Sequence, residues 1–319
     1  MALLEVRDLK TYFFTTKGPV KAVDGVSFEV GRAEALGLAG ESGCGKTTAA
    51  LSILRLLQSP GRTIEGKVIF EGEDLLEKSE EEMQAIRWKK ISIIFQGAMN
   101  ALNPVFKIGE QIAEGITVHE NVSENTAEKR AEKLLELVGL DKSRFNNYPH
   151  ELSGGMRQRA MIAMALACNP DLVIADEPAT ALDVIVQAQV LKLMKDLQKR
   201  LKLSMILITH DLSMIAETCN KIAIMYAGKI AEYAQAISLF KNPMHPYTQG
   251  LLKAFPDVRS RGGMLSSIPG DPPDLLNPPS GCGFHPRCLY AKVICSKKEP
   301  ELREVEKRHY AACHLIGKF

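Results

Sequence analysis

Apolar and polar positions in the first sixty residues predict strands that lead into a helix. Between residues 3 and 30 apolar and polar positions alternate, which is typical of antiparallel strands around a turn at residues 17–19. Residues 35–39 are a short apolar run of strand length, and residues 47–57 carry apolar side chains at helical spacing. This part of the chain is therefore predicted as two antiparallel strands, a buried strand and a helix.

The middle of the chain alternates between helical and strand patterns. Residues 109–140 are charged with helical periodicity, which predicts a mostly solvated helical insertion. Residues 172–175, 205–209 and 222–226 are apolar runs typical of buried strands, and the helical stretch 184–201 separates the first two. Because buried strands that alternate with helices form parallel sheets, we predict an α/β fold with a parallel sheet covered by helices.

The pattern changes after about residue 253, where prolines interrupt any long helix or central strand. These prolines are Pro256, Pro269, Pro272, Pro273, Pro278, Pro279 and Pro286. Four of the seven cysteines also lie in this part of the chain. We therefore predict a main domain at 1–253, with a helical subdomain at about 97–165, and a proline- and cysteine-rich extension at 254–319.

Length and charge narrow the class of protein. With 319 residues, 45% of them apolar, the chain can bury a large core. Its 40 basic and 38 acidic residues are interspersed and give a net charge of +2, which gives little support to nucleic-acid binding. The longest apolar runs are far below the ~20 residues of a membrane-spanning helix, and residues 1–10 lack the pattern of a signal peptide. We expect a cytosolic protein.

A phosphate-binding loop is predicted at residues 40–47, Gly-Glu-Ser-Gly-Cys-Gly-Lys-Thr, between a predicted strand and a predicted helix. Its glycines let backbone amides surround phosphates, Lys46 would reach the β- and γ-phosphates of a nucleotide, and Thr47 would bind Mg²⁺. The residues predicted to bind the nucleotide and Mg²⁺, in this loop and directly after it, are Ser42, Gly43, Cys44, Gly45, Lys46, Thr47 and Thr48. Kinases, GTPases and motor ATPases share such a loop, so it does not by itself settle the reaction. The alternative is a glycine-rich turn that matches by chance, and for Cys44 a small side chain at a tolerant position is favoured over a redox sensor.

Two further motifs restrict the chemistry. The apolar run 172–175 delivers Asp176, suited to hold the Mg²⁺ shell, and Glu177, suited to polarise a water molecule in line with the γ-phosphate. Ser153 and the glycines at 154–155 begin a helical stretch, so they form an N-cap with exposed amides. An acidic strand end in solvent and an ordinary cap are the alternatives when each motif is taken alone.

In this combination the chain resembles the D-type ATP-binding subunit of the dipeptide and oligopeptide ABC importers, over essentially its whole length. The matching segments are Phe95-Gln96, Ala101-Leu102-Asn103-Pro104, Glu151 to Arg159, Ala175-Asp176-Glu177-Pro178, Ala181-Leu182-Asp183 and Thr209-His210-Asp211. The resemblance implies an ABC-type P-loop nucleotide-binding domain, with a RecA-like parallel sheet core, an antiparallel β subdomain and a helical subdomain. Departures are Gly97-Ala98 after the glutamine and Ala179 after Asp-Glu-Pro.

The resemblance also implies roles for single residues. Gln96 would sense Mg²⁺ and water and couple its loop to the membrane subunits, and His210 would act as the γ-phosphate switch, both in catalysis with Glu177. The resemblance implies that ATP bound to one subunit is covered by the other subunit's Ser153, Gly154 and Gly155, with Asp183 on the dimer-crossing loop. Phe13 or Tyr12 would stack on adenine. Taken alone, Gln96 is a surface amide and His210 a strand-end histidine.

Partners follow from the same resemblance. They are a second ATPase subunit, expected to be a related but non-identical F-type chain, two membrane permease subunits, and indirectly an extracytoplasmic peptide-binding protein. The expected place is the cytoplasmic face of the cell membrane, as a peripheral subunit. Peptides are the expected cargo, while importers of nickel, glutathione or oligosaccharides use very similar ATPase subunits. A soluble ABC ATPase acting on DNA ends or ribosomes is less favoured, because the chain lacks long coiled-coil insertions. An iron–sulfur carrier is less favoured, because it would not require the Gln96 loop and the Ser153 motif together.

Four cysteines of the extension form a candidate metal site. Segments 245–248 and 272–279 resemble the extension of peptide-importer ATPases, and the candidate ligands are Cys282, Cys288, Cys295 and Cys313. Their spacings of five, six and seventeen residues are wider than zinc knuckles, and some members of the family bind a cubane cluster. A structural [4Fe–4S] cluster is therefore expected, with zinc, free thiols or a disulfide as the alternatives.

Overall fold

The computed structural model describes residues 2–97, 101–254 and 268–316, and the chain forms two compact units. Unit 1 contains Gly31–Glu34 and Glu77–Ile208, and unit 2 contains Ala2–Val30, Ala35–Leu76 and the chain from Thr209 onward, within the described residues. Some predictions from the sequence, such as the interruption at Pro256 and the departure at Ala98, lie outside the described residues.

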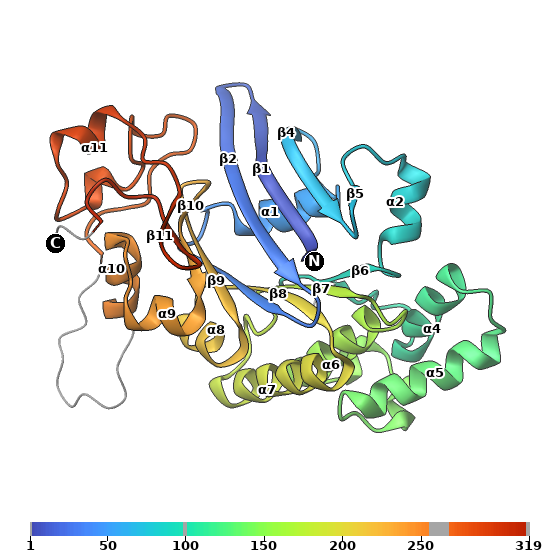
Figure 1. The fold of residues 1–319 in the computed structure, drawn as a ribbon. Helices are drawn as coiled ribbons and strands as arrows, with labels where there is room; N and C mark the ends of the chain where they lie inside the picture. Colours follow the sequence, from blue (N-terminus) through green and yellow to red (C-terminus); the bar gives the residue numbers. More distant parts are fainter. Residues whose placement is uncertain (1, 98–100, 255–267, 317–319) are drawn as a thin grey trace. The chain divides into compact units, whose positions relative to one another are not determined.

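Unit 2 contains a four-stranded sheet with the order β2-β1-β4-β5 (Figure 1). Its strands are β1 (Ala2–Thr15), β2 (Gly18–Gly31), β4 (Gly61–Phe70) and β5 (Glu73–Asp74), and β1 pairs antiparallel with β4. Leu4 and Val6 of β1 are buried in alternation, as expected of a strand with one covered face. The register with β4 shifts between Arg7 and Lys10, and beyond it Leu9 and Thr11 are the buried residues. The two long strands predicted from the alternation are therefore present, with their turn at residues 16–17.

Unit 2 also contains a run of mixed strands. β3 (Ala35–Ala39) is parallel to β9 (Lys221–Tyr226), and β9 is antiparallel to β10 (Lys229–Gln235). The hairpin of β11 (Arg303–Glu306) and β12 (His309–Ala311) adds to β10, because β12 pairs antiparallel with that strand. The predicted strands at 35–39 and 222–226 are present, whereas the sequence patterns did not reveal β10 or this hairpin.

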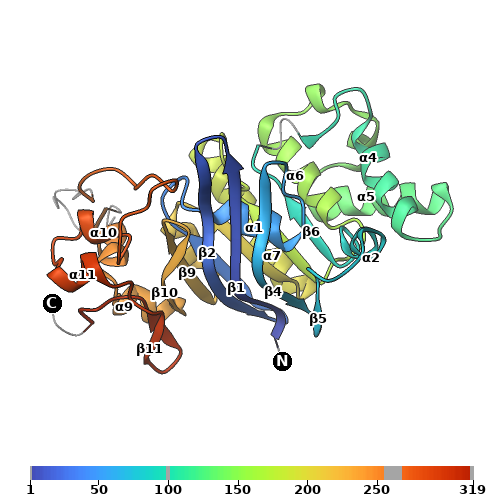
Figure 2. The same cartoon turned by 90° about the horizontal axis from the view of Figure 1, so that it is seen from above.

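The helices of unit 2 are short. They are α1 (Lys46–Ile53), α8 (Leu212–Thr218), α9 (Ala236–Lys241), α10 (Pro246–Ala254) and α11 (Val293–Lys297), with a 3₁₀ turn η3 at His285–Arg287. The helix predicted for 47–57 ends at Ile53, because Arg55 adopts a left-handed conformation with φ 53°. The segments β10, β11, α9, α10 and α11 lie side by side in both views (Figures 1 and 2).

Unit 1 contains three parallel strands and most of the long helices. β6 (Ile91–Ile94), β7 (Leu172–Asp176) and β8 (Ser204–Thr209) pair in that order. The helices are α2 (Glu80–Ile86), α4 (Ile108–His119), α5 (Glu124–Leu137), α6 (Gly154–Ala165) and α7 (Val184–Leu201), with 3₁₀ turns η1 (Lys142–Asn146) and η2 (Pro149–Glu151). The charged stretch 109–140 is thus two helices, which cluster with α6 in both views (Figures 1 and 2).

Helix α7 illustrates why the pattern was readable. Asp183 caps its first turn by accepting hydrogen bonds from the backbone N–H groups of Ile185 and Val186, at 3.1 and 3.0 Å. Its buried side chains, Val190, Met194 and Leu197, recur at helical spacing. The helix therefore has the bounds that its periodicity predicted.

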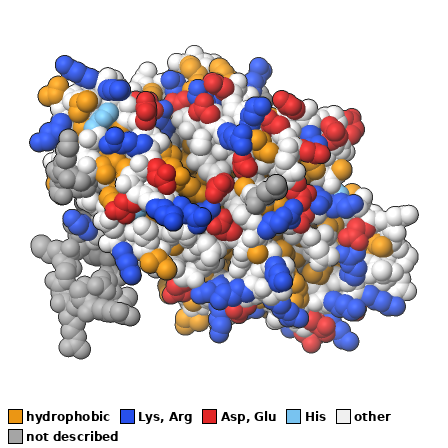
Figure 3. Space-filling view, viewed as in Figure 1, with side chains coloured by type: hydrophobic (Ala, Val, Ile, Leu, Met, Phe, Trp, Pro, Cys, Tyr) orange, Lys and Arg blue, Asp and Glu red, His pale blue; other side chains and the backbone are white. Residues whose placement is uncertain are grey.

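Surface charge agrees with the interspersed sequence. Lysine, arginine and acidic side chains are mixed over the face shown in Figure 3. Among residues 2–97, 101–254 and 268–316, the structure has no helix that is both long and apolar enough to cross a membrane.

Candidate active site

The loop at 40–47 follows the fully buried strand β3 and leads into α1. At two of its glycines, Gly40 and Gly45, there is no room for a side chain. A Cβ at Gly40 would lie 2.2 Å from the carbonyl oxygen of Met225, and one at Gly45 would lie 2.0 Å from that of Ala22. Both glycines also have positive φ, 150° and 105°. The loop is therefore held tightly against the backbone of unit 2.

Lys46 bonds to carbonyl groups of its own loop. Its side chain is 5% exposed, and Nζ donates to the carbonyl oxygens of Gly40 and Glu41 at 2.8 and 2.9 Å. Nζ also lies 3.7 Å from Sγ of Cys44. Burial raises the pKa of the Cys44 thiol, although the Lys46 ammonium acts in the opposite direction.

The first turn of α1 provides the remaining predicted residues of the loop. Gly45, which has no side chain, occupies the N-cap, and Thr47 and Thr48 follow at the start of the helix. Thr47 is exposed and Thr48 is half-buried. Ser42 and Gly43, earlier in the loop, are also exposed. Because the backbone N–H groups at a helix start carry partial positive charge, this turn is suited to an anion.

The two aromatic candidates for adenine stacking are neighbours on β1. Tyr12 is half-buried, and its hydroxyl donates a hydrogen bond of 2.6 Å to Asp24 Oδ1. Nζ of Lys21 lies 5.8 Å from the centre of the Tyr12 ring. Burial and the bond to Asp24 raise the pKa of Tyr12. Phe13 is also half-buried and packs next to Gly61.

In unit 1, the end of β7 brings two predicted carboxylates together. Asp176 is the last residue of the strand and is 2% exposed. Glu177 follows with φ 44°, in the left-handed region that non-glycine residues rarely adopt. Its backbone N–H donates a hydrogen bond of 2.9 Å to the carbonyl oxygen of Ile208. The carboxyl groups of two successive residues, Asp176 and Glu177, are therefore placed at the carboxyl end of a buried strand.

Glu177 is contacted by one residue that the sequence singled out and by one that it did not. Gln96 Nε2 donates to Glu177 Oε2 at 2.9 Å. The hydroxyl of Thr180 donates to the same oxygen, also at 2.9 Å. Sequence reasoning examined Ala179 as a departure and passed over the threonine next to it. A hydroxyl three residues after a carboxylate in a turn was the available signal.

The predicted cap at Ser153 is present at the start of α6. Ser153 Oγ accepts a hydrogen bond from the backbone N–H of Met156 at 3.4 Å, and Ser153 is exposed. A Cβ at Gly155 would lie 2.5 Å from Val186, so α6 and the start of α7 approach closely there. Asp183, which caps α7, is exposed. In unit 2, His210 is also exposed and immediately precedes Asp211, the N-cap of α8.

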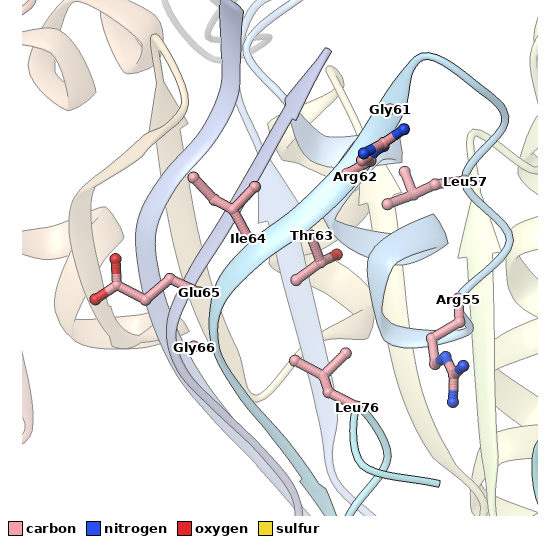
Figure 4. Close-up of a pocket in the computed structure, with 9 residues that line it drawn as sticks. All are labelled: Arg55, Leu57, Gly61, Arg62, Thr63, Ile64, Glu65, Gly66 and Leu76. Carbon is pink, nitrogen blue, oxygen red and sulfur yellow. The ribbon is translucent and has the colours of Figure 1, made fainter. Parts of the chain in front are cut away.

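A surface hollow lies elsewhere in unit 2. It has a volume of about 390 Å³ and is lined along β4 and by Arg55, Leu57 and Leu76 (Figure 4). Its walls come from residues 55, 57, 61–66 and 76, outside the loop at 40–47.

The cysteine prediction requires a correction. Cys282, Cys288, Cys295 and Cys313 line one hollow of only about 10 Å³, room for about one water molecule. Within the described residues, which include all seven cysteines, every cysteine is a free thiol and no three His, Cys, Asp or Glu side chains form a group that could hold a metal ion. The expected [4Fe–4S] cluster is therefore wrong, as is zinc, and free thiols are what the structure contains.

Three of these four thiols have a raised pKa in the metal-free structure. Burial raises the pKa of Cys282 to about 11, and it also raises the pKa of Cys288 and of Cys313. In each case the cause is burial, which disfavours the charged thiolate. Wide spacing in the sequence was thus a poor guide to how the side chains are arranged.

Comparison with known proteins adds to this geometry. A family described as ABC transporter matches residues 23–180, and one described as oligopeptide/dipeptide transporter, C-terminal region, matches residues 231–295. The first match includes the loop at 40–47 and the end of β7.

Similar proteins cover nearly the whole chain. The oligopeptide transport ATP-binding protein OppD of Bacillus subtilis is 49% identical over 318 residues, which is 98% of this chain and 89% of the relative. The dipeptide transport ATP-binding protein DppD of Haemophilus influenzae is 44% identical, over 98% of this chain and 96% of the relative. A solved dimer of the ATP-binding cassette MJ0796 with ADP and Pi has TM-score 0.66 and 26% identity, over 73% of this chain and 98% of that one.

Proposed function

This chain belongs to the ATP-binding proteins of the ABC transporters, and we propose that it is the ATP-hydrolysing, D-type subunit of an importer that takes up peptides. The observation that carries the ATPase half is the pair of donors on Glu177. Gln96 and Thr180 both bond to Glu177 Oε2, so the carboxylate has a fixed direction at the end of a buried strand. A positioned carboxylate is what polarising an attacking water requires.

We assign the phosphate-binding role to the loop at 40–47. Lys46 would exchange its bonds to the carbonyls of Gly40 and Glu41 for bonds to phosphate oxygens. The start of α1, with Thr47 and Thr48, would add backbone donors and a hydroxyl. This exchange of partners explains how a buried lysine can be satisfied both with and without nucleotide.

The donor chemistry also fits Mg²⁺, which prefers carboxylate and hydroxyl oxygens and phosphate. The carboxylate of Asp176 is buried at the strand end, and the hydroxyl of Thr47 is at the exposed helix start. When bound, Mg²⁺ would neutralise charge on the β- and γ-phosphates. We therefore assign Asp176 and Thr47 to the metal, Glu177 to the water, Gln96 to sensing both, and His210 to the γ-phosphate. Phe13 or Tyr12 would stack on adenine.

A second ATPase subunit is proposed to complete the site. Val184 and Ile185, directly after Asp183, are 81% and 72% exposed, which is unusual for large apolar side chains. Such a surface supports burial against another chain. We propose that the second subunit, a related F-type chain, covers Val184 and Ile185 and that Ser153, Gly154 and Gly155 cover the nucleotide bound by that subunit.

The membrane subunits are assigned to the region of Gln96. Phe95, directly before Gln96, is 41% exposed, and Val105 and Phe106, which follow it in the chain, are 71% and 52% exposed. Apolar side chains on both sides of Gln96 in the sequence are therefore at the surface of unit 1. We propose that two permease subunits dock there from the cytoplasmic face of the membrane, with a peptide-binding protein acting from the other side. Hydrolysis would then change the position of the Gln96 loop and drive transport.

The peptide cargo is supported by the second family match, at residues 231–295, and by relatives whose names specify oligopeptide and dipeptide transport. We retain the division into an ATPase domain at 1–253, with a helical subdomain at about 97–165, and a peptide-importer extension at 254–319. Nickel, glutathione and oligosaccharides are the competing cargoes.

Uptake measurements test this proposal. Cells that lack this chain, complemented with wild type or Glu177→Gln, would be assayed for uptake of a labelled dipeptide, a labelled tetrapeptide, glutathione and nickel. Peptide uptake restored by wild type alone supports the proposal. Uptake of only nickel or glutathione would reject the cargo, and full uptake with Glu177→Gln would reject the catalytic assignment. Mg²⁺-dependent ATP hydrolysis by the purified transporter should fall by about 100-fold or more in the same variant.

A further inference from the structure

Glu41, the second residue of the loop at 40–47, has each of its polar groups bonded. Its backbone N–H donates to Oη of Tyr247 at 2.9 Å. Its carbonyl accepts from Lys46 at 2.9 Å. Its carboxylate accepts two bonds from Arg287, at 2.6 and 2.9 Å. Two of these three partners come from the C-terminal part of the chain, more than 200 residues away.

Arg287 is bound on all sides. Only 6% of its side chain is exposed, against 25% of that of Glu41. In addition to the carboxylate, its Nε donates to the carbonyl of Pro269 at 2.8 Å, and Nη1 donates to Oη of Tyr226 at 3.3 Å. A bidentate arginine–carboxylate pair in a buried place has a fixed geometry, unlike an exposed ion pair. Arg287 therefore fixes the direction of the Glu41 carboxylate and places a positive charge against it.

The segment that carries Arg287 rests on an aromatic cluster. The rings of Tyr226, Tyr247 and Phe284 lie 4.6–5.3 Å apart, centre to centre, and all three residues are buried. Tyr226 ends β9, Tyr247 is on α10, and Phe284 precedes the 3₁₀ turn that contains Arg287. The cluster thus joins three separate segments, and Tyr247 connects it to the loop at 40–47 through the bond to Glu41.

We propose that Arg287 and Tyr247 are positioning residues of the nucleotide site, and that they set its affinity for ATP through Glu41. The inference rests on the proposed function, because it takes residues 40–47 as the phosphate-binding loop. Arg287 neutralises the carboxylate that stands next to the phosphates, and Tyr247 holds the backbone N–H of the same residue. Without Arg287, an uncompensated negative charge would face the anionic phosphates and repel them.

The expected result is a change in ATP affinity with little change in turnover. In Arg287→Gln, the KM for ATP and the Kd for a fluorescent ATP analogue should rise about tenfold, because one unit charge next to the phosphates is no longer balanced. The kcat should stay within about twofold, because the groups around Glu177 are unchanged. In the double variant Glu41→Gln with Arg287→Gln, both charges are absent, so affinity should recover to within about threefold of wild type.

Control variants separate positioning from general stability. Arg130→Gln breaks another partly buried arginine–glutamate pair, to Glu120 in unit 1, and should leave the KM unchanged. Arg287→Lys keeps the positive charge but loses the planar guanidinium that makes two parallel bonds to the carboxylate. Its affinity for ATP should therefore lie between those of Arg287→Gln and wild type. Tyr247→Phe removes only the acceptor of the Glu41 N–H and gives a second test if Arg287→Gln does not fold.

The outcomes are distinguishable from those of the proposed function. If folded Arg287→Gln, or Tyr247→Phe in its place, binds the analogue as wild type does, the inference is rejected. If the double variant binds as weakly as Arg287→Gln alone, the charge argument is rejected. If Lys46→Ala binds the analogue normally, the loop is not the phosphate site, and the proposed function fails on its own. Circular dichroism and melting curves would establish that each variant is folded.

Discussion

The side-chain amide of Gln96 and the carboxylate of Glu177 are joined by a hydrogen bond of 2.9 Å, across 81 residues of sequence. Gln96 follows the strand β6, and Glu177 follows its parallel neighbour β7, so the two side chains meet where adjacent strands end. A loop that moves Gln96 would therefore change the surroundings of the proposed catalytic carboxylate directly. This is a physical connection between the surface around Phe95 and the proposed site of hydrolysis.

Thr180 gives the first prediction. Its hydroxyl donates to the same oxygen of Glu177 at 2.9 Å, so it helps to fix the carboxylate. Thr180→Val keeps the shape of the side chain and removes the donor. The kcat for ATP should fall about three- to tenfold, as expected when a positioning hydrogen bond of about 1 kcal/mol is lost, while the KM stays constant. Thr180→Ser, which keeps the hydroxyl, should behave as wild type. Equal kcat values for Thr180→Val and wild type would contradict the role.

Two glycines of the proposed phosphate-binding loop form a matched pair. A Cβ at Gly45 would lie 2.0 Å from the carbonyl oxygen of Ala22, whereas a Cβ at Gly43 would point into open space, and both residues have positive φ. Gly43→Ala should therefore lower the free energy of unfolding by only ~1–2 kcal/mol, the cost of the left-handed conformation. Gly45→Ala should cost clearly more, because the backbone must move. Urea unfolding measures both, and equal losses would show that the clash is relieved without cost.

Local patterns predicted the elements that local residues determine. The helical stretch predicted at 184–201 has the bounds of α7, whose buried side chains Val190, Met194 and Leu197 recur at helical spacing within one segment. Strand β12 has only three residues, too few for a readable alternation, and it is fixed by pairing with β10, some 75 residues earlier. Such a strand is determined by tertiary packing rather than by its own sequence.

The candidate site shows the same division. Lys46 and Glu177 could be found because their motifs are continuous, whereas the bonds of Arg287 to Glu41 join residues 246 positions apart. The cysteines show the converse error. Their spacing suggested ligands, but the hollow that Cys282 and Cys295 help to line is too small for a cluster. Spacing along a proline-rich segment does not determine the distances between its side chains.

His245 predicts a pH dependence of stability. Burial lowers the pKa of its imidazole from 6.5 to about 4, although the nearby Glu232 carboxylate acts in the opposite direction. Between pH 7 and pH 4 the unfolded chain binds a proton that the folded chain does not, so the free energy of unfolding falls as the pH falls through this range. The loss approaches about 3 kcal/mol below pH 4. Equilibrium unfolding in urea at successive pH values measures it.

A matched variant isolates this contribution from that of the carboxylates. Nδ1 of His245 accepts the backbone N–H of Tyr247 at 3.0 Å, and the side-chain oxygen of an asparagine can accept the same bond. His245→Asn should therefore fold, and its stability should fall less between pH 7 and pH 4 than that of wild type. If both proteins lose the same free energy over this range, His245 is not responsible for the slope.

Glu232 gives the last prediction, because it joins the C-terminal hairpin to the rest of unit 2. Its carboxylate is fully buried and accepts the backbone N–H groups of Met244 and His245, both at 2.8 Å. It also lies 2.7 Å from Nε2 of His309 on β12. Glu232→Ala would leave these buried donors without an acceptor, so the free energy of unfolding should fall by ~3–5 kcal/mol.

The control is a carboxylate in an exposed pair. Glu65 accepts a bond of 2.7 Å from Lys10, and its side chain is 58% exposed. Glu65→Ala should cost at most ~1 kcal/mol, as is usual for surface pairs. Urea unfolding compares the two variants, and similar losses would contradict a structural role for Glu232. A large loss with Glu232→Ala would mean that a buried carboxylate on β10 holds β12 and the residues that precede α10 in place.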